Sequence, residues 1–350
     1  MKRSRLLVVV LVALAAAPSA AAESAVVGYP SSMAATGDSI TRAFNTCFIP
    51  FLDCPPNSWS TGTSSTVNSH YRRILAANPA ILGRNHNDAV SGAEMAGLQS
   101  QAQRAVSQGV EYVTVLMGAN DACASTEAGM TPVATFRAQF AAAMATLSAG
   151  LPSARVYVVS IPDVHRLWEI YHGSLAARTT WSLLRICQSL LARPGSTAQA
   201  DVDRRNRVRQ RVIEYNAQLS DVCAAYVHCR FDGNAAFETD FVRSDVSTRD
   251  YFHPSVAGQA KAAAVTWAAG FDFNDGAAPV SSASTAPAGG GTSVTIEATD
   301  DVAVSGVEYR LGPDAWTRYD GAVTVPAGTV LTWRAVDVNG NVEATQALTG

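Results

Sequence analysis

The sequence predicts a parallel β-sheet covered by helices on both faces, followed by a small antiparallel β-module. Between about residues 25 and 273, short continuous apolar runs alternate with longer stretches of helical spacing. Strands that are apolar on both sides are typical of a parallel sheet buried between two layers of helices. Beyond about residue 293 the apolar residues recur at every second position, and Gly-Pro, Asp-Gly and Asn-Gly pairs separate the runs, which indicates an antiparallel sandwich.

The elements of the larger domain follow in order along the chain. Strands are expected over 32–36, 87–90, 112–117 and 156–161, with a weaker one over 224–231. Helices are expected over 97–108, 131–148, 201–220 and 256–269, and a further helix is expected to begin at Thr41.

The start of the chain is typical of a secretory signal peptide. Lys2, Arg3 and Arg5 precede an apolar run over 6–16, and Ala20-Ala21-Ala22 supplies a cleavage site before residue 23. The run is too short for a transmembrane helix, and no later stretch reaches about 18 apolar residues. We therefore expect a secreted, extracellular protein without a transmembrane anchor.

Composition divides the 350 residues into four parts. The expected division is a signal peptide over 1–22, an α/β domain over 23–274, a flexible linker over 275–292 and a β-sandwich module over 293–350. The linker is assigned because its Gly-, Ser-, Ala- and Pro-rich sequence has almost nothing to bury.

The six cysteines suggest three disulfides, because an exported protein matures in an oxidising compartment. Sequence alone allows many pairings. We favour the sequential one, because Cys47–Cys54 and Cys223–Cys229 would clip short loops, which leaves Cys123–Cys187 as the third pair. Without a CxxC or HExxH motif we expect neither a metal site nor a cofactor. The net charge of -3 gives no reason to expect a nucleic-acid partner.

Four short blocks carry the candidate chemistry. They read Gly37-Asp-Ser-Ile-Thr41, Val90-Ser-Gly92, Gly118-Ala-Asn-Asp121 and Asp250-Tyr-Phe-His-Pro254. The first three follow predicted strands, at the carboxyl ends where open α/β sheets place their sites. Each block alone is short enough to occur by chance, whereas the ordered set indicates one site.

Ser39 is the candidate nucleophile and His253 the candidate base. Serine needs a neighbouring group to take its proton, and Asp250 lies three residues before His253, within reach of the second ring nitrogen. The alternative for Ser39 is a plain helix N-cap. The remaining histidines lack a carboxylate at this spacing and are interpreted as structural: His70, His86, His165, His172 and His228.

Three groups are candidate donors to an oxyanion, the negatively charged oxygen that forms during acyl transfer. They are the backbone amides of Ser39 and Gly92 and the side-chain amide of Asn120. Gly and Asn are also the commonest turn residues, which is the alternative interpretation of both. Asp121 is expected to hold the turn that directs Asn120.

With these four blocks the chain resembles the SGNH or GDSL-like hydrolase family over about 34–269. The resemblance implies a flavodoxin-like three-layer α/β/α fold and ester hydrolysis through an acyl-enzyme. It makes Ser39, Gly92, Asn120 and His253 the name-giving residues, with Asp250 completing the triad. Residue 40 is Ile where the family usually has Leu. Segments 118–123, 161–168 and 250–259 are similar to secreted bacterial lipase and phospholipase-like members, and the C-terminal module resembles the Ig-like modules of secreted hydrolases.

The sequence thus predicts a secreted lipase or esterase, with phospholipase activity among the alternatives, acting on an ester or lipid substrate. A carbohydrate esterase that removes acyl groups from polysaccharide is one rival. A catalytically silent surface-binding protein is another. A serine peptidase is disfavoured, since no G-x-S-x-G elbow is present.

Four features of the sequence could serve either in binding or in the structure of the protein. The apolar segments 44–59 and 167–191 could wall an acyl-chain groove, with Phe51 and Trp59 as test positions, or belong to the core. The Arg-rich segment 201–211 could meet anionic lipid or form a solvated helix face. The module's aromatic residues could form a platform that contacts polysaccharide or another surface, or fill its core: Tyr309, Trp316, Tyr319 and Trp333.

Overall fold

A five-stranded parallel sheet forms the centre of the larger domain in the computed structural model, which describes residues 28–350. The predicted signal peptide over 1–22 lies outside the described residues. The strands are β1 (Met33–Gly37), β2 (Asn85–Asn87), β3 (Tyr112–Leu116), β4 (Arg155–Val158) and β5 (Cys229–Phe231). Their order is β2-β1-β3-β4-β5, with every neighbouring pair parallel. This is the flavodoxin-like order, so the predicted fold class is confirmed.

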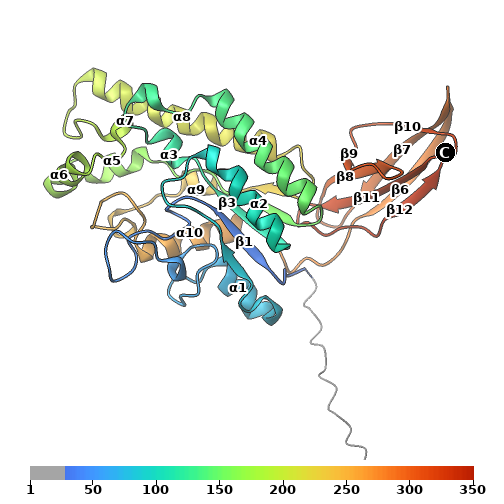
Figure 1. Cartoon of the computed structure of the whole chain (residues 1–350), viewed down its shortest axis with the longest axis horizontal. Coiled ribbons are helices and arrows are strands. Elements are labelled where there is room, and N and C mark those ends of the chain that lie inside the picture. Colours follow the sequence, from blue (N-terminus) through green and yellow to red (C-terminus); the bar gives the residue numbers. More distant parts are fainter. Residues whose placement is uncertain (1–27) are drawn as a thin grey trace, which may run out of the picture.

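Helices cover both faces of the sheet (Figure 1). One face carries α2 (Leu98–Gln108), α4 (Val133–Gly150) and α8 (Gln199–Cys223), and the other carries α1 (His70–Ala77) and α10 (Val256–Ala269). Shorter helices are α3 (Ala119–Ala122), α5 (His165–Tyr171), α6 (Leu175–Leu183), α7 (Gln188–Leu191) and α9 (Ala235–Glu238). Single 3-10 turns lie at Pro55–Asn57, Pro79–Ile81, Met95–Gly97, Glu127–Gly129 and Arg243–Asp245.

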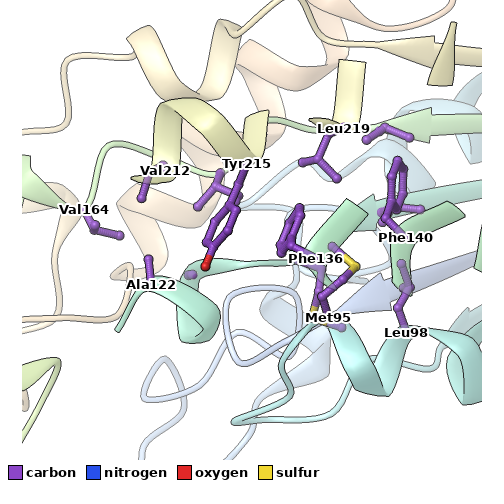
Figure 2. Close-up of a cluster of buried hydrophobic side chains, with 14 of the residues drawn as sticks. Met95, Leu98, Ala122, Phe136, Phe140, Val164, Val212, Tyr215 and Leu219 are labelled. Atoms are coloured by element: carbon purple, nitrogen blue, oxygen red, sulfur yellow. The ribbon is translucent and has the colours of Figure 1, made fainter. Parts of the chain in front are cut away.

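The strands are apolar on both sides because each side meets a different helix layer. On β3, Val113 and Val115 join the cluster with α2, α4 and α8, whereas Tyr112 and Leu116 join the cluster with α1 and α10. In the first cluster the rings of Phe136 and Tyr215 stack with centroids 4.1 Å apart (Figure 2). Burial on both sides explains why these strands could be predicted from continuous apolar runs.

The segment after β1 is a compact turn, and the helix expected from Thr41 is not formed. Residues 38–45 are bends and turns, with single backbone bonds from the Arg42 amide to Asp38 and from the Phe44 amide to Ser39. Ala43 and Asn45 have φ values of 51° and 67°, which a right-handed helix does not allow. Tertiary contacts of this turn therefore override its helical pattern.

Three disulfides are present, and their pairs are those of the sequential arrangement. Cys47–Cys54 closes the loop that follows the turn after β1. Cys123–Cys187 joins the end of α3 to the start of α7 across 64 residues, and Cys223–Cys229 joins the end of α8 to β5.

The C-terminal module is all antiparallel, with sheets of order β10-β7-β6 and β12-β11-β8-β9. Its strands are β6 (Val280–Ala288), β7 (Gly291–Thr299), β8 (Val304–Leu311), β9 (Thr317–Arg318), β10 (Val323–Pro326), β11 (Val330–Asp337) and β12 (Gln346–Thr349). The all-β architecture agrees with the period-two pattern of the sequence. The Ig-like resemblance stays a prediction.

The flexible linker expected over 275–292 was wrong, because most of it is strand. Residues 280–288 form β6, which pairs with β7 along its whole length through a tight turn at Gly290, where φ is 91°. Glu343 also bonds the amide and hydroxyl of Ser281. Backbone pairing stabilises this strand although its side chains are small and mostly exposed. The module therefore begins near residue 280 rather than 293.

The module packs against the amino ends of the parallel strands. Arg155, the first residue of β4, donates to Asn341 at 3.0 Å, and the Ser305 hydroxyl donates to the Val227 carbonyl just before β5 at 2.8 Å. It consequently lies at the opposite end of the sheet from the carboxyl ends (Figure 1). Within residues 28–350, no helix combines the length and the apolar character that crossing a bilayer requires.

Candidate active site

Ser39 lies in a tight turn at the carboxyl end of β1, beside the point where the strand order reverses between β1 and β3. Gly37 has a φ of 149°, and a Cβ there would stand 2.4 Å from the Leu116 carbonyl oxygen, so only glycine fits. The buried Gln101 side chain accepts from the Gly37 amide at 2.7 Å and donates to its carbonyl at 2.9 Å. These contacts fix the backbone from which Ser39 projects.

Ser39, His253 and Asp250 form one chain of hydrogen bonds. His253 Nε2 lies 2.8 Å from Ser39 Oγ, and His253 Nδ1 lies 2.7 Å from Asp250 Oδ2. The three groups are mostly shielded from solvent, with Ser39 7% and Asp250 2% exposed. The structure therefore brings together residues 214 positions apart in the arrangement that the sequence predicted.

His253 is positioned by the start of α10. Its carbonyl accepts from the Ser247 amide at 2.8 Å, and Ser255 caps the helix by accepting from the Gly258 amide at 3.1 Å. One turn into α10, Gln259 donates to the Ile40 carbonyl at 2.7 Å, so the helix is tied directly to the turn that carries Ser39. The Phe44 ring packs against the imidazole with centroids 4.8 Å apart.

Asp250 is held by four donors and is set up to remain ionised. Its Oδ1 accepts from the amides of Phe252 and His253 at 3.0 and 3.1 Å, and its Oδ2 accepts from His253 and from Asn45 Nδ2. Burial acts to raise the pKa of Asp250, but the hydrogen bonds and the charge of His253 outweigh it and lower that pKa below its ordinary value. Sequence reasoning missed Asn45, because nothing near it in the sequence signals a contact 205 residues away.

Gly92 and Asn120 line the same cleft as Ser39 and His253. Gly92 has a φ of 81° and open space where a Cβ would point, so its backbone can be approached closely. Asn120 Nδ2 donates to the Ala93 carbonyl at 2.8 Å, which orients the amide beside Gly92. The predicted donor groups are thus gathered around Ser39.

Asp121 links the second and third blocks. Its Oδ2 accepts from the Met95 amide at 2.8 Å, which fixes the segment after Gly92 against the one that carries Asn120. Burial raises the pKa of Asp121 to about 6, and burial raises that of Asp38, the neighbour of Ser39, to about 6 as well.

Two cavities meet at Ser39, Asn120, Phe252 and His253. The first, here called the apolar pocket, has a volume of about 70 Å³ and is bounded mainly by apolar side chains: Ile40, Val164, Leu167, Ile170, Phe241 and Phe252. The second, here called the open cleft, has a volume of about 380 Å³, and its walls include Phe44 and Ile186. A substrate with one apolar arm and a second group on the other side of a carbonyl would fit this arrangement.

The chain is similar in sequence to a known family of enzymes. The model of the GDSL-like lipase/acylhydrolase family matches residues 35–261, about two thirds of the chain. The chain belongs to this family. A search of curated proteins finds no match.

Solved structures similar to this GDSL-like chain include an extracellular lipase from Streptomyces rimosus. It is 18% identical, with a TM-score of 0.42, over 68% of this chain and 99% of that one. Phospholipase A1 from Streptomyces albidoflavus is 18% identical, with a TM-score of 0.41, over 65% and 94% of the two chains. A putative platelet activating factor from Streptococcus pneumonia is 15% identical, with a TM-score of 0.39, over 67% and 81%. The family assignment depends on the match to residues 35–261 alone.

The apolar segments 44–59 and 167–191 contribute some residues to the two cavities and others to the core or the surface. Phe44 borders the open cleft of this GDSL-like protein, and Leu167 and Ile170 border the apolar pocket, as the groove hypothesis requires. Trp59 is fully buried in the core, with its indole nitrogen 3.3 Å from Thr41 Oγ1, and Phe51 lies on the surface. Neither wall contains Phe51 or Trp59, so these test positions were wrong.

The five other histidines do not join Ser39. His70 is buried between Tyr112 and Thr266, and burial lowers its pKa to about 3. His165 lies 3.1 Å from Glu169, and His228 lies 3.5 Å from Glu308 at the module interface. His172 Nδ1 lies 3.0 Å from the Trp168 carbonyl oxygen. His86 lines neither of the two cavities at Ser39.

The Arg-rich segment of α8 makes internal contacts. Arg205 is buried with its guanidinium over the Trp168 ring at 4.1 Å, Arg207 pairs with Glu127, and Arg209 pairs with Asp163 at 2.6 Å. These arginines brace the helix against its neighbours, which disfavours the lipid-binding alternative.

In the module, Trp333 is core, and Tyr309 and Tyr319 pack edge-to-face with centroids 6.3 Å apart. The guanidinium groups of Arg310 and Arg334 lie 4.8 and 4.4 Å from the centre of the Trp316 ring. The aromatic residues are therefore committed to internal contacts, which favours their interpretation as structural residues.

Among the described residues, one group of three acids could hold a cation: Asp275, Asp300 and Asp337. It lies at the junction with the module, far from Ser39. Asp337 already accepts from the amides of Asn339 and Asn341 at 2.9 and 2.7 Å. No metal ligation is assigned to the group, and the expectation of no metal or cofactor stays a prediction.

Proposed function

We propose that this protein is an exported serine ester hydrolase that acts on lipid esters, a lipase or phospholipase. The observation that carries the proposal is the Ser39–His253–Asp250 chain, with distances of 2.8 and 2.7 Å, opening onto a pocket with apolar walls. The three disulfides support export, because such bonds persist in oxidising compartments.

In the first half of the reaction, Ser39 Oγ attacks the ester carbonyl carbon while His253 Nε2 takes the hydroxyl proton. Asp250 holds the imidazole in the required tautomer and stabilises the positive charge it acquires. The negative charge that develops on the carbonyl oxygen is stabilised by the Ser39 and Gly92 amides and the Asn120 side chain. The bond to the alcohol then breaks, and His253 donates its proton to the leaving oxygen, which leaves an acyl-enzyme.

In the second half, water replaces the alcohol. His253 takes a proton from the water as its oxygen attacks the acyl carbon, and the tetrahedral intermediate collapses with return of that proton to Ser39. The carboxylic acid leaves and the enzyme is restored. The acyl chain is placed in the apolar pocket and the alcohol part in the open cleft, because the pocket is enclosed by apolar side chains whereas the cleft opens to solvent.

The test compares the wild type with Ser39→Ala on p-nitrophenyl esters from acetate to palmitate and on phosphatidylcholine. We expect the substitution to lower kcat/KM by at least about 10³-fold, because the nucleophile is removed. Ser100→Ala, at an exposed serine on α2, is the matched control and should retain full activity. Preference for medium or long chains is expected from the apolar pocket.

Three other outcomes of these assays would contradict the proposal. Activity confined to acetate would favour a carbohydrate esterase. Equal activity of the wild type and Ser39→Ala would remove Ser39 from the mechanism. A folded wild type that hydrolyses no ester and is not labelled by a serine-directed covalent probe would favour the silent surface-binding protein.

A further inference from the structure

The loop closed by the Cys47–Cys54 disulfide, here called the apolar loop (residues 47–54), turns its large apolar side chains outward. Phe48 is 96% exposed, and Ile49, Phe51 and Leu52 are each more than half exposed. The described part of the chain has thirteen exposed large apolar side chains, and four of them fall within these five consecutive positions. An exposed apolar patch on a disulfide-closed loop marks an interaction surface rather than a folding defect.

The apolar loop lies beside the open cleft. It follows Phe44, which forms one wall of the cleft, by only a few residues. Ile186, which also lines the cleft, follows two further exposed apolar residues, Leu183 and Leu184, which are 76% and 52% exposed. Two residues of the cleft wall are thus close in sequence to exposed apolar side chains.

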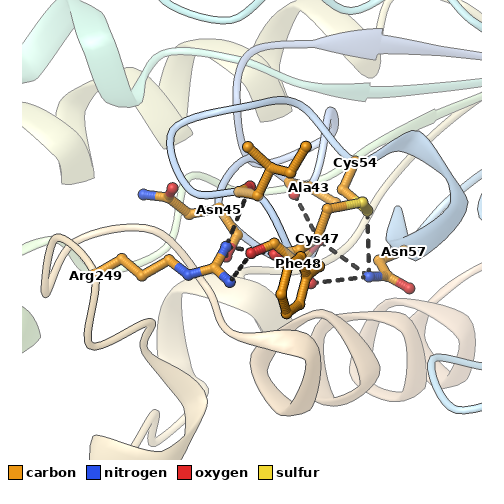
Figure 3. The surroundings of a disulfide bond; sticks show 9 residues. Ala43, Asn45, Cys47, Phe48, Cys54, Asn57 and Arg249 are labelled. Carbon is orange, nitrogen blue, oxygen red and sulfur yellow. Dashed lines mark hydrogen bonds between the residues drawn. A yellow bond between two sulfur atoms is a disulfide. The ribbon is translucent and has the colours of Figure 1, made fainter.

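Arg249 bonds the first two carbonyls of the apolar loop and one carbonyl just before it. The Arg249 guanidinium reaches under the loop and donates to the carbonyls of Asn45, Cys47 and Phe48, at 3.0 Å for the first and third (Figure 3). Arg249 precedes Asp250, so the residue that anchors the loop is attached to the candidate triad.

Other polar groups of the loop are also paired. The Leu52 carbonyl accepts from the Asn45 amide at 3.0 Å, and the Phe51 amide donates to Asn45 Oδ1 at 2.5 Å. Asp53, the one ionisable residue of the loop, pairs with Arg42 at 3.0 Å. Entering an apolar phase is costly mainly for unpaired polar groups, and the pairing of these carbonyls, of the Phe51 amide and of Asp53 lowers that cost for the loop.

We infer that the apolar loop, together with Leu183 and Leu184, docks the protein on a lipid surface, so that a lipid ester passes directly into the open cleft. This inference rests on the proposed function, since it names the physical state in which the substrate is met. A lipid surface is favoured over a protein partner because the loop exposes four large apolar side chains and its one charged side chain is already paired with Arg42. Exposed Arg185 next to Leu184 suits the phosphate groups at the edge of such a surface.

The test measures binding separately from hydrolysis. Two proteins are sedimented with sucrose-loaded phosphatidylcholine vesicles. The parent carries Ser39→Ala, and the loop variant carries Ser39→Ala together with Phe48→Ser, Ile49→Ser and Leu52→Ser. We expect the loop variant to lose roughly a hundredfold or more in vesicle affinity, because three exposed apolar side chains no longer enter the lipid. With Ser39 intact, the same loop substitutions should leave hydrolysis of soluble p-nitrophenyl acetate unchanged.

The matched control carries Leu82→Ser, Val280→Ser and Val302→Ser, three exposed apolar positions that border neither cavity. It should bind vesicles as the Ser39→Ala parent does. In a second measurement, Phe48→Trp should add fluorescence that brominated phosphatidylcholine quenches.

Four results would overturn the inference. They are no vesicle binding by the parent, equal binding by the loop variant, equal loss of binding in the control, and conversion of a dimer to a monomer by the loop substitutions in light scattering. The last would make the apolar loop an interface between copies. None of these results depends on ester hydrolysis, so failure of the docking surface is distinguishable from failure of the proposed function.

Discussion

At the scale of single residues, Asn45 connects the apolar loop to the candidate triad. Its side-chain oxygen accepts from the Phe51 amide, and its side-chain nitrogen donates to Asp250 Oδ2. Continuous hydrogen bonds therefore run from the loop through Asn45, Asp250 and His253 to Ser39. Asn45 is a positioning residue in this scheme, since it acts on the serine only through other groups.

Replacing this residue, Asn45→Ala, should lower kcat for a soluble short-chain ester by about ten- to a hundredfold and leave KM nearly unchanged. The reason is that Asp250 loses one hydrogen bond to its charged form, an interaction worth about 1.5–3 kcal/mol. The measurement is steady-state kinetics on p-nitrophenyl acetate, with the melting temperature followed in parallel.

Asn57→Ala is the matched control, because Asn57 braces the same loop through Thr46 without touching Asp250. An equal fall in kcat in both variants would mean that Asn45 acts through the loop alone.

The residues that sequence reasoning could locate are those whose partners lie nearby or whose block has a chemical pattern. Asp250 precedes His253 by three positions, and Ser39 follows a strand end, so spacing alone suggested their roles. Asn45 and Arg249 carry no such pattern, because their contacts join the loop to a segment about 200 residues away. Only the folded chain brings these segments together.

At the scale of elements, the turn between β3 and α3 depends on a glycine. Gly118 has a φ of 126°, and a Cβ there would stand 2.5 Å from Ile161 Cδ1 and 2.9 Å from the Phe136 ring. The turn is therefore constrained both by its own backbone conformation and by the core beneath it.

We expect Gly118→Ala to destabilise the protein by about 2–4 kcal/mol, because it adds backbone strain to overpacking. Urea unfolding measures the change. Gly173→Ala is the matched control, since its added Cβ meets no atom within 4 Å, and it should shift the free energy of unfolding by less than about 0.5 kcal/mol. Similar values for the two variants would contradict the role assigned to Gly118.

Elements were predictable where burial dictates the sequence, and less so where backbone pairing does. Strands β3 and β4 lie between two helix layers and are mainly apolar, so their positions agree with the predicted ones to within a few residues. Strand β6 has mostly small, exposed side chains and is held by its pairing with β7, which its composition does not reveal.

At the scale of the whole molecule, a buried ionic cluster joins the module to the α/β domain. Glu308 on β8 pairs with Arg334 on β11 and lies 3.5 Å from His228, just before β5. Burial acts to raise the pKa of Glu308, but the hydrogen bonds and charges of His228 and Arg334 outweigh it and lower that pKa. The stability that Glu308 contributes is therefore present above its ordinary pKa and is lost as the pH falls.

The variant Glu308→Gln should unfold about 1–3 kcal/mol more easily than the wild type at pH 7, because it leaves the mostly buried Arg334 guanidinium without its partner. The difference should shrink as the pH falls below the ordinary glutamate pKa of about 4.3, because the carboxyl of the wild type is then progressively protonated. Urea unfolding across this pH range measures it. Glu297→Gln, at an exposed position on β7, should match the wild type throughout; a Glu308→Gln difference that does not change with pH would contradict the assigned ion pair.

The module packs on the amino ends of the parallel strands, whereas Ser39 and both cavities lie at the carboxyl ends. A protein attached to a solid support through the outer strands of the module, such as β12, would hold its reaction centre facing the surrounding liquid (Figure 1). The fold thus provides a handle for oriented immobilisation, in which neighbouring molecules on the support would not block one another's substrate.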